Sequence, residues 1–337
     1  MAVIGIAVLV AVLAAVLISP VLGSRPDDSA AVAGGSGADR PLLFGASAGD
    51  RAAIERTESD LGRTLSGIRI FRRWGAELID ADARWAAEGG RQLFLSVRAR
   101  YPDGRLIRFR EVADALPGSP LYDDMVEQAR QVREFGQPVY LTFNHEPDAD
   151  PENGGAQAFI AAWRNWVTVL RNQGATNARF IWTTTGFGYG RSDERAAQRY
   201  WPGAGWTDLI GVDAYNSYRC KNPTGPWASP ADLLRPVLAF AAGQPDHPVM
   251  LMEWSSVEDP QNPTRKADWF RELARLLRQP ETRQVVGLLQ WGGDVDFENG
   301  GPGCDYGYSS SDQARVALRE VAADPQLQAR RLPGEAR

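Results

Sequence analysis

The stretch Pro138-Val-Tyr-Leu-Thr-Phe-Asn-His-Glu-Pro147 has the form of a short apolar strand that leads directly into a His–Glu pair. Its β-branched and aromatic side chains favour a strand, and Gly136 and Pro138 bound it on the N-terminal side. A carboxylate at the end of a buried parallel strand lies in a low-dielectric environment, which raises its pKa toward values suited to acid catalysis. Glu146 is therefore a candidate functional residue.

A second stretch, Pro248-Val-Met-Leu-Met-Glu253-Trp254, has the same organisation further along the chain. Two carboxylates, each at the carboxyl end of its own apolar strand, are the groups that glycoside hydrolysis requires. The alternative is that either glutamate is a rim residue in an ordinary salt bridge. The occurrence of two such glutamates in equivalent positions favours the catalytic interpretation.

Apolar runs of this kind alternate with amphipathic segments from residue 41 onward, which is the pattern of repeated βα units. The predicted strands are Leu42–Phe44, Ile68–Phe71, Leu93–Ser96, Val139–Phe143, Phe180–Thr183, Leu209–Val212, Val249–Met252 and Val286–Gln290. The predicted helices are Arg51–Gly62, Ala76–Glu88, Leu121–Glu134, Gly155–Asn172, Ser192–Arg199, Pro230–Ala242, Pro263–Arg278 and Ser311–Ala323. The chain is thus expected to form an α/β fold, a single (β/α)8 TIM barrel with its active site at the carboxyl ends of the strands.

The segments outside the barrel have distinct compositions. Residues 1–23 are uncharged and almost wholly apolar, and we interpret them as a signal peptide or membrane anchor, with cleavage after Gly23 or Ala33 as alternatives. Residues 24–40 are expected to form a flexible linker, residues 41–324 the barrel, and residues 325–337 a loose C-terminal tail. The protein is accordingly expected to be exported, either extracellular or at the cell surface.

Composition excludes several function classes. The formal net charge of −5 gives no basic footprint for nucleic acid, and the chain has only two histidines, too few for a three-histidine zinc site. No Gly-x-Ser-x-Gly motif supports a serine nucleophile. The acidic runs Asp148–Asn153 and Asp294–Glu298 do not have EF-hand spacing, and we interpret them as solvated loops. We expect no metal, no cofactor and a monomeric protein.

The two cysteines, Cys220 and Cys304, follow the sixth and eighth predicted strands. In an exported protein a disulfide between them is the favoured interpretation, with two free thiols as the alternative. Both cysteines lie on the catalytic face, where a bridge would rigidify one side of the substrate cleft.

The two glutamates have different expected roles. Glu146 is the candidate acid/base and Glu253 the candidate nucleophile; carboxyl groups about 5 to 5.5 Å apart imply retention of configuration, and a wider gap implies inversion. His145 could tune Glu146 or bind sugar. Tyr215 is placed to donate its hydroxyl to Glu253, unless that hydroxyl bonds to the backbone.

Other candidates for substrate binding follow other strands. Trp291, directly after the eighth strand, could form the floor beneath the sugar at the cleavage point, or could simply cap the core. Arg73 and Trp74 follow the second strand and are weaker candidates. Arg98 follows the third strand, where a surface salt bridge is the favoured interpretation.

The chain resembles glycoside hydrolase family 26 of clan A, whose activities include β-mannanase, β-1,3-xylanase and mixed-linkage β-glucanase. The resemblance extends over most of residues 41–323 and rests on His145-Glu146, Ala162-Trp163-Arg164, Asn177-Ala-Arg-Phe-Ile-Trp182, Tyr200-Trp-Pro-Gly203, Asp208-Leu-Ile-Gly-Val-Asp-Ala-Tyr-Asn216 and Pro248-Val-Met-Leu-Met-Glu253. It implies that Glu146 is the acid/base, that Glu253 is the nucleophile, and that His145 and Tyr215 are active-site residues.

The chain departs from the mannanases of this family in two places. Residues 147–154 replace the usual glycine and tryptophan-rich segment, and Trp254 is followed by Ser255 rather than glycine. We therefore expect a secreted or membrane-anchored retaining endo-β-glycanase that acts on β-mannan, β-glucan, β-xylan or a bacterial envelope glycan. The alternative is a catalytically weak carbohydrate-binding protein on the same barrel.

Overall fold

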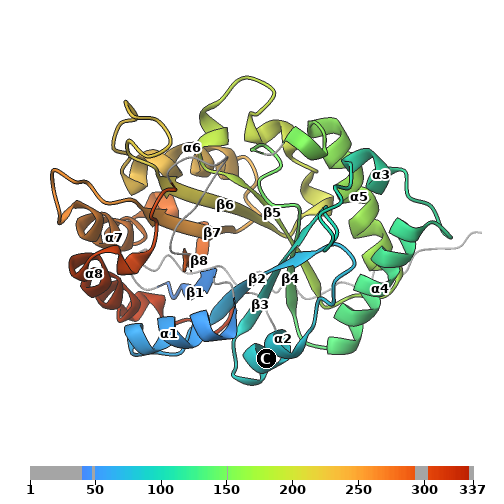
Figure 1. Cartoon of the computed structure of the whole chain (residues 1–337), viewed down its shortest axis with the longest axis horizontal. Coiled ribbons are helices and arrows are strands. Elements are labelled where there is room, and N and C mark those ends of the chain that lie inside the picture. Colours follow the sequence, from blue (N-terminus) through green and yellow to red (C-terminus); the bar gives the residue numbers. More distant parts are fainter. Residues whose placement is uncertain (1–39, 48–49, 150, 293–302, 334–337) are drawn as a thin grey trace, which may run out of the picture. The chain divides into compact units, whose positions relative to one another are not determined.

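The computed structural model describes residues 40–47, 50–149, 151–292 and 303–333. Within them, eight parallel strands close into a barrel in sequence order, from β1 to β8 and back to β1, which confirms the predicted TIM barrel (Figure 1). The strands are β1 Leu43–Ser47, β2 Gly67–Arg73, β3 Gln92–Arg98, β4 Val139–Phe143, β5 Ala178–Thr185, β6 Leu209–Asn216, β7 Val249–Ser256 and β8 Val285–Trp291.

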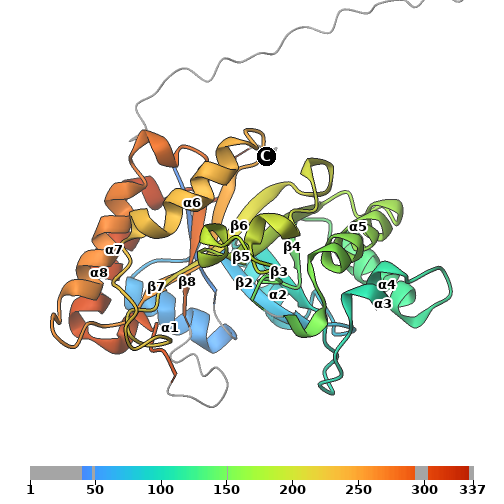
Figure 2. The same ribbon diagram turned by 90° about the horizontal axis from the view of Figure 1, so that it is seen from above.

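Helices cover the outside of the barrel. They are α1 Arg51–Leu61, α2 Ala81–Glu88, α3 Phe109–Ala113, α4 Pro120–Phe135, α5 Ala156–Asn172, α6 Pro230–Ala242, α7 Arg265–Leu276 and α8 Asp312–Ala322. In both views α7 and α8 lie together on one side of the strands, and α3, α4 and α5 lie on the other (Figure 1 and Figure 2).

Two helix predictions need correction. The helix expected from Ala76 begins at Ala81, because the side chain of Asp80 accepts a hydrogen bond from the backbone N–H of Ala83 and caps the helix there. The segment 192–199 forms no α-helix and contributes only to the short 3-10 turn Ala197–Tyr200. The short helix α3, in the long connection after β3, was not predicted.

Alternation along each strand divides the core into two layers. In β4, Tyr140 points into the barrel and stacks on Phe94 of β3 with ring centroids 4.8 Å apart. Phe143, whose side chain is on the opposite face of the same strand, packs outward against Phe159 and Trp166 of α5. The interior layer turns polar toward the carboxyl ends of the strands, where Thr142, for example, bonds to the carbonyl of Ile181.

A local irregularity in β7 places its glutamate. The pairing of β7 with β8 shifts register between Leu251 and Trp254, and the pairing with β6 shifts at Val212 and Asp213. Such bulges redirect side chains at the ends of barrel strands. As a result Met252 packs in the barrel interior, and the carboxylate of the next residue, Glu253, also reaches buried interior partners.

The C-terminal segment is not a loose tail as far as residue 333. The backbone N–H of Ala329 donates to the carbonyl of Leu42, and the N–H of Leu332 donates to the side chain of Gln92 at 2.9 Å. Leu332 is buried in the cluster that fills the barrel interior. The expectation of a loose tail was wrong here because this segment packs at the amino-terminal ends of the strands, where β1 and β3 begin.

The predicted signal peptide or anchor, residues 1–23, and nearly all of the predicted linker lie outside the described residues. Among the helices that the structure does describe, none has the length and apolar character needed to span a bilayer.

Candidate active site

Glu146 lies just beyond β4 in a backbone conformation that few residues adopt. Asn144 and Glu146 both have positive φ angles, 40° and 53°. The N–H of Asn144 donates to the carbonyl of Val97 at 2.8 Å, and the N–H of Glu146 donates to the carbonyl of Thr183 at 3.0 Å. Strained residues of this kind cost about 1–3 kcal/mol each and persist where the surrounding structure holds them. Bonds to both neighbouring strands therefore fix the direction of the Glu146 side chain.

The environment of Glu146 favours its protonated form. Burial raises the pKa of Glu146 to about 8, and the negative charges of Glu253 and Asp148 contribute in the same direction. The cations Arg69 and Lys221 oppose this shift. At neutral pH the side chain thus holds a proton that it can donate, which is the requirement for a general acid.

The environment of Glu253 differs from that of Glu146, because its carboxylate accepts hydrogen bonds from two donors. Its Oε1 accepts a hydrogen bond from Nη1 of Arg69 at 2.8 Å, and its Oε2 accepts one from the hydroxyl of Tyr215 at 2.6 Å. Donors to a carboxylate favour its ionised form. The bond from Tyr215 is the one expected from the sequence, and a carboxylate in its ionised form can act as a nucleophile.

Arg69 and Asp213 complete this arrangement and were not singled out from the sequence. Arg69 is fully buried in the barrel; its Nη1 also contacts Oδ1 of Asp213 at 3.2 Å, and its Nε donates to Ser96 at 2.9 Å. Burial and the charge of Glu253 raise the pKa of Asp213 well above its usual value, although Arg69 acts against this. One guanidinium therefore holds two carboxyl groups in the barrel interior.

His145 lies beside this cluster as a neutral ring. Burial, together with the positive charges of Arg69 and Arg98, lowers the pKa of His145 well below its usual value. Its ring packs against Phe71 at 5.3 Å, and its buried Nδ1 has no hydrogen-bond partner among the described residues. A buried polar atom without a partner is rare in proteins, so the environment of the His145 ring is an unusual one.

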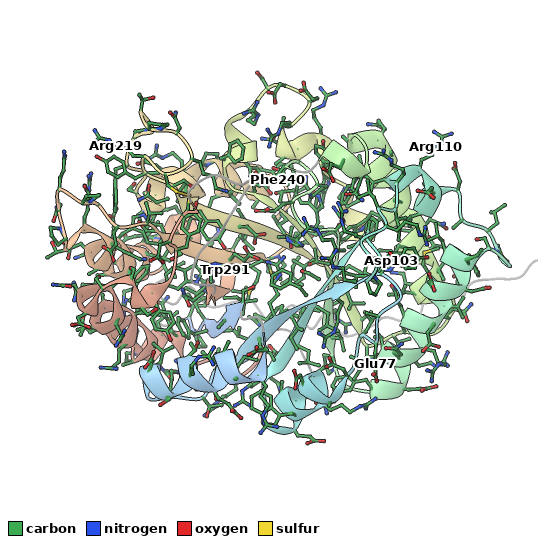
Figure 3. The ribbon with its side chains drawn as sticks, viewed as in Figure 1. Glu77, Asp103, Arg110, Arg219, Phe240 and Trp291 are labelled. Carbon is green, nitrogen blue, oxygen red and sulfur yellow. A yellow bond between two sulfur atoms is a disulfide. The ribbon has the colours of Figure 1, made fainter. Side chains whose placement is uncertain are left out.

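Trp291 ends β8 on the same side. Figure 3 labels it among the side chains of the barrel. Its ring makes edge-on contacts with two other rings, Phe71 at 6.1 Å and Tyr215 at 6.5 Å between centroids. It is partly exposed, and its indole Nε1 has no hydrogen-bond partner among the described residues. The structure thus places Trp291 next to Tyr215, the residue whose hydroxyl donates to Glu253.

The remaining candidates are placed differently. Trp74 is fully buried outside the barrel, with its Nε1 donating to Asp124 at 2.9 Å and its ring edge-on to Phe143. Its expected role in substrate binding was wrong, because no part of the ring is exposed. Arg73 and Arg98 are exposed and occupy paired register positions at the ends of β2 and β3, so both stand at the rim.

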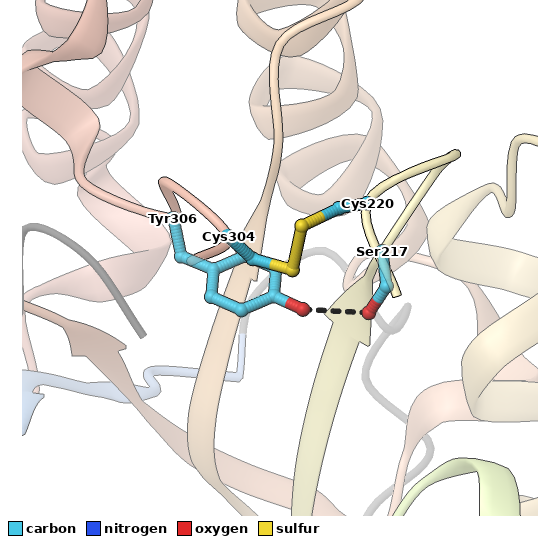
Figure 4. Close-up of a disulfide and its surroundings, with 4 residues drawn as sticks. All are labelled: Ser217, Cys220, Cys304 and Tyr306. Atoms are coloured by element: carbon cyan, nitrogen blue, oxygen red, sulfur yellow. Dashed lines mark hydrogen bonds between the residues drawn. A yellow bond between two sulfur atoms is a disulfide. The ribbon is translucent and has the colours of Figure 1, made fainter. Parts of the chain in front are cut away.

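The predicted disulfide is confirmed. Cys220, in the connection after β6, is bonded to Cys304, in the connection after β8, with Cα atoms 5.7 Å apart (Figure 4). In the described part of the chain, no group of three or more His, Cys, Asp or Glu side chains is arranged to hold a metal ion. The acidic run at 294–298 lies outside the described residues, and Asp148 of the other run is buried and accepts hydrogen bonds from Thr185.

At the level of sequence, the similarity of this chain to known proteins is low. No protein-family model matches the chain. Endoglucanase H of Acetivibrio thermocellus is 23% identical over 206 residues, which are 58% of this chain and 21% of that protein, so the match covers about a fifth of that relative's length.

Solved structures of similar fold are glycoside hydrolase family 26 domains. The β-mannanase of Bacteroides ovatus has a TM-score of 0.58 at 18% identity, over 86% of this chain and 90% of that one. The family 26 domain of an endo-β-mannanase/endo-β-glucanase from Prevotella bryantii has a TM-score of 0.57 at 11% identity, over 86% and 91%. A modular endo-β-1,4-mannanase from Cellulomonas fimi has a TM-score of 0.59 at 17% identity, over 85% and 71%. The resemblance expected from the sequence is thus confirmed at the level of the fold.

Proposed function

We propose that this protein is a retaining endo-β-glycanase, with Glu146 as the acid/base and Glu253 as the nucleophile. The observation that carries the proposal is the opposite environment of the two glutamates. The pKa of Glu146 is raised to about 8, whereas Glu253 accepts hydrogen bonds from Arg69 and Tyr215. A carboxyl group that holds its proton, beside a second one whose donors favour ionisation, is what acid-assisted cleavage of a glycosidic bond needs.

The proposed reaction is a double displacement. In the first step an oxygen of Glu253 bonds to the anomeric carbon while the glycosidic bond breaks, and Glu146 passes its proton to the departing oxygen. In the second step Glu146, now ionised, removes a proton from water as the water oxygen displaces Glu253 from the anomeric carbon. The two inversions give net retention, and both side chains return to their starting states.

Neighbouring residues act on the substrate in this proposal. The neutral ring of His145 is partly exposed and can contact the sugar with its accessible side, whereas its Nδ1 is buried. Trp291 offers an indole surface to the sugar ring beside Tyr215. Arg73 and Arg98, at the rim, can contact sugar units of the glycan that lie further from the cleavage point.

The substrate is proposed to be a polysaccharide. The names of the related proteins mention β-mannan and β-glucan, and β-xylan and bacterial envelope glycans belong to the same chemistry. The Pro147–Gly154 segment departs from the mannanases of the family, which favours a glycan other than mannan. The disulfide and the apolar residues 1–23 support export, so we place the enzyme outside the cell or at its surface.

The experiment is a screen for released reducing ends on β-mannan, β-glucan, β-xylan and envelope polysaccharides. Glu146→Gln and Glu253→Gln should each lower turnover on the hydrolysed glycan by at least about a thousandfold while leaving binding intact. Glu134→Gln, an exposed change on α4, is the matched control and should have wild-type activity. Binding of a glycan by the wild type without any turnover would instead support the carbohydrate-binding alternative.

A further inference from the structure

Tyr306 packs directly on the residue that holds the proposed nucleophile. It lies in the segment after β8, is only 2% exposed, and has its ring centroid 4.4 Å from that of Tyr215. The hydroxyl of Tyr215 in turn donates to Glu253 at 2.6 Å. Tyr306 is therefore one contact away from the carboxylate, although it comes from a part of the chain with no predicted role.

Tyr306 is also bonded to both strands that carry these residues. Its hydroxyl forms a 2.6 Å hydrogen bond with the hydroxyl of Ser217, just after β6 (Figure 4). Its backbone carbonyl accepts a hydrogen bond from the hydroxyl of Ser255, which stands two residues after Glu253 in β7. The residue thus joins the ends of β6 and β7 at the level where Tyr215 meets Glu253.

Two anchors hold the segment that contains Tyr306. On one side, Cys304 is bonded to Cys220 in the connection after β6. On the other, the fully buried Lys266 of α7 donates from Nζ to the carbonyl of Gly307 at 2.6 Å and to the hydroxyl of Ser310 at 2.8 Å. The main chain around Tyr306 is thereby fixed from both directions.

From these contacts we infer that Tyr306 is a positioning residue, which keeps the hydroxyl of Tyr215 directed at Glu253, and that the Cys220–Cys304 disulfide is needed to keep it in place. This inference rests on the proposed function, because it assigns the role through the nucleophile. The ring of Tyr306 limits the movement of the Tyr215 ring, and the disulfide limits the movement of Tyr306. Loss of the Tyr306 ring or of the disulfide should therefore weaken the hydrogen bond from Tyr215 to Glu253.

Three variants test the role of the ring. Tyr306→Ala should lower kcat about ten- to a hundredfold with KM changed less than about threefold, because a displaced nucleophile slows the chemical step. Tyr306→Phe keeps the ring and should retain most of the activity. Tyr308→Ala is the matched control, since Tyr308 is buried in the same segment but bonds to Asp60 and packs in the outer core. It should lower the melting temperature comparably and leave kcat unchanged.

The pH profile separates positioning from a loss of folded protein. In Tyr306→Ala the hydroxyl of Tyr215 should donate less well to Glu253, so the ionised form of that carboxylate loses a hydrogen bond. The acid limb of the kcat/KM profile should therefore move to higher pH. Tyr308→Ala should show the wild-type profile. Wild-type kcat and an unshifted profile in Tyr306→Ala would overturn the inference.

The role of the disulfide is tested in Cys220→Ser/Cys304→Ser and by reducing the wild type. A phosphine breaks the S–S bond to two thiols and is itself oxidised to the phosphine oxide, with oxygen from water. Both treatments should lower kcat about tenfold, and reoxidation should restore the reduced wild type. A folded double variant with full kcat would contradict this part of the inference.

The double variant has a second readout. Lys221, next to Cys220, lowers the pKa of Glu146 through its charge. Without the disulfide, Lys221 is held less closely to Glu146, and the pKa of Glu146 should rise. The alkaline limb of the kcat/KM profile should therefore move to higher pH. Failure of the proposed function is distinct from failure here. A wild type that hydrolyses none of the glycans overturns both, whereas an active wild type with an unaffected Tyr306→Ala overturns only this inference.

Discussion

Replacing Arg69 with methionine removes the guanidinium that pairs with Glu253 at 2.8 Å and with Asp213 at 3.2 Å. Arg69 and Asp213 have fully buried side chains, and that of Glu253 is 8% exposed, so water cannot take over the lost contacts. Breaking a buried ion pair by removing one partner costs about 3–5 kcal/mol. With an unfolding entropy of about 2.1 cal/mol/K per residue over roughly 280 residues, this corresponds to a melting temperature lower by about 5 to 8 °C.

The pH dependence of this loss has a definite sign. Burial and Glu253 already raise the pKa of Asp213 above its usual value, and Arg69 opposes that shift. Without Arg69 the folded protein holds this proton to still higher pH than the unfolded chain does. Stability therefore falls as pH rises from the ordinary carboxyl pKa, about 4, toward the raised one. The deficit of Arg69→Met relative to wild type should be small near pH 4 and largest near pH 8.

The assay is thermal unfolding by intrinsic fluorescence between pH 4 and pH 8. Arg271→Met is the matched control, because Arg271 also contacts two carboxylates, Glu320 and Asp268, but is 36% exposed. Exposed pairs contribute about 0–1 kcal/mol, so its melting temperature should fall by less than about 2 °C. An Arg69→Met deficit as small as that of the control, or one that is the same at pH 5 and pH 8, would refute this reasoning.

Three further predictions concern single residues. Asp148, whose pKa is about 6, carries a negative charge at neutral pH that raises the pKa of Glu146. Asp148→Asn removes this charge, so the alkaline limb of the activity profile should move below about pH 8. An upward shift of that limb would contradict this prediction. Tyr215→Phe should lower kcat/KM about ten- to a hundredfold, because a hydrogen bond to a charged group is lost; unchanged initial rates on the hydrolysed glycan would argue against it. Burial lowers the pKa of Lys266 to about 8, so between pH 8 and about 10.5 the unfolded chain binds more protons and stability rises with pH. Urea unfolding should show this rise in wild type, by about 3 kcal/mol, and not in Lys266→Met.

The positions of the strands were predictable because each one contains an apolar run that packs against the helices. For β4 the expected bounds, Val139–Phe143, are those observed. Other strands extend further at their carboxyl ends: β6 was expected to end at Val212 and continues to Asn216. The added residues include Asp213 and Asn216, whose types are depleted in strands, so propensity ends the strand before them. Both are nevertheless buried and bonded, Asp213 to Arg69 and Asn216 to Ser256.

The two glutamates and Tyr215 were identified because they stand at or near strand ends in recognisable motifs. Arg69 was missed, since it lies within the predicted strand Ile68–Phe71, and its partners are 144 and 184 residues away in the chain. An arginine between two buried isoleucines was the available signal, because a charge within a buried strand needs a partner in the barrel interior. Tyr306 gave no such signal beyond its proximity to Cys304.

The central claim is that Glu253 bonds covalently to the anomeric carbon while Glu146 handles the proton. It is tested most directly by incubating the wild type with 2-deoxy-2-fluoro-β-glycosides of gluco, manno and xylo configuration that carry good leaving groups, followed by peptide mapping. We predict a mass gain of one glycosyl unit on the peptide that contains Glu253, and none in Glu253→Gln. A glycosyl label on Glu146, on Asp213 or on any other carboxylate would contradict the account.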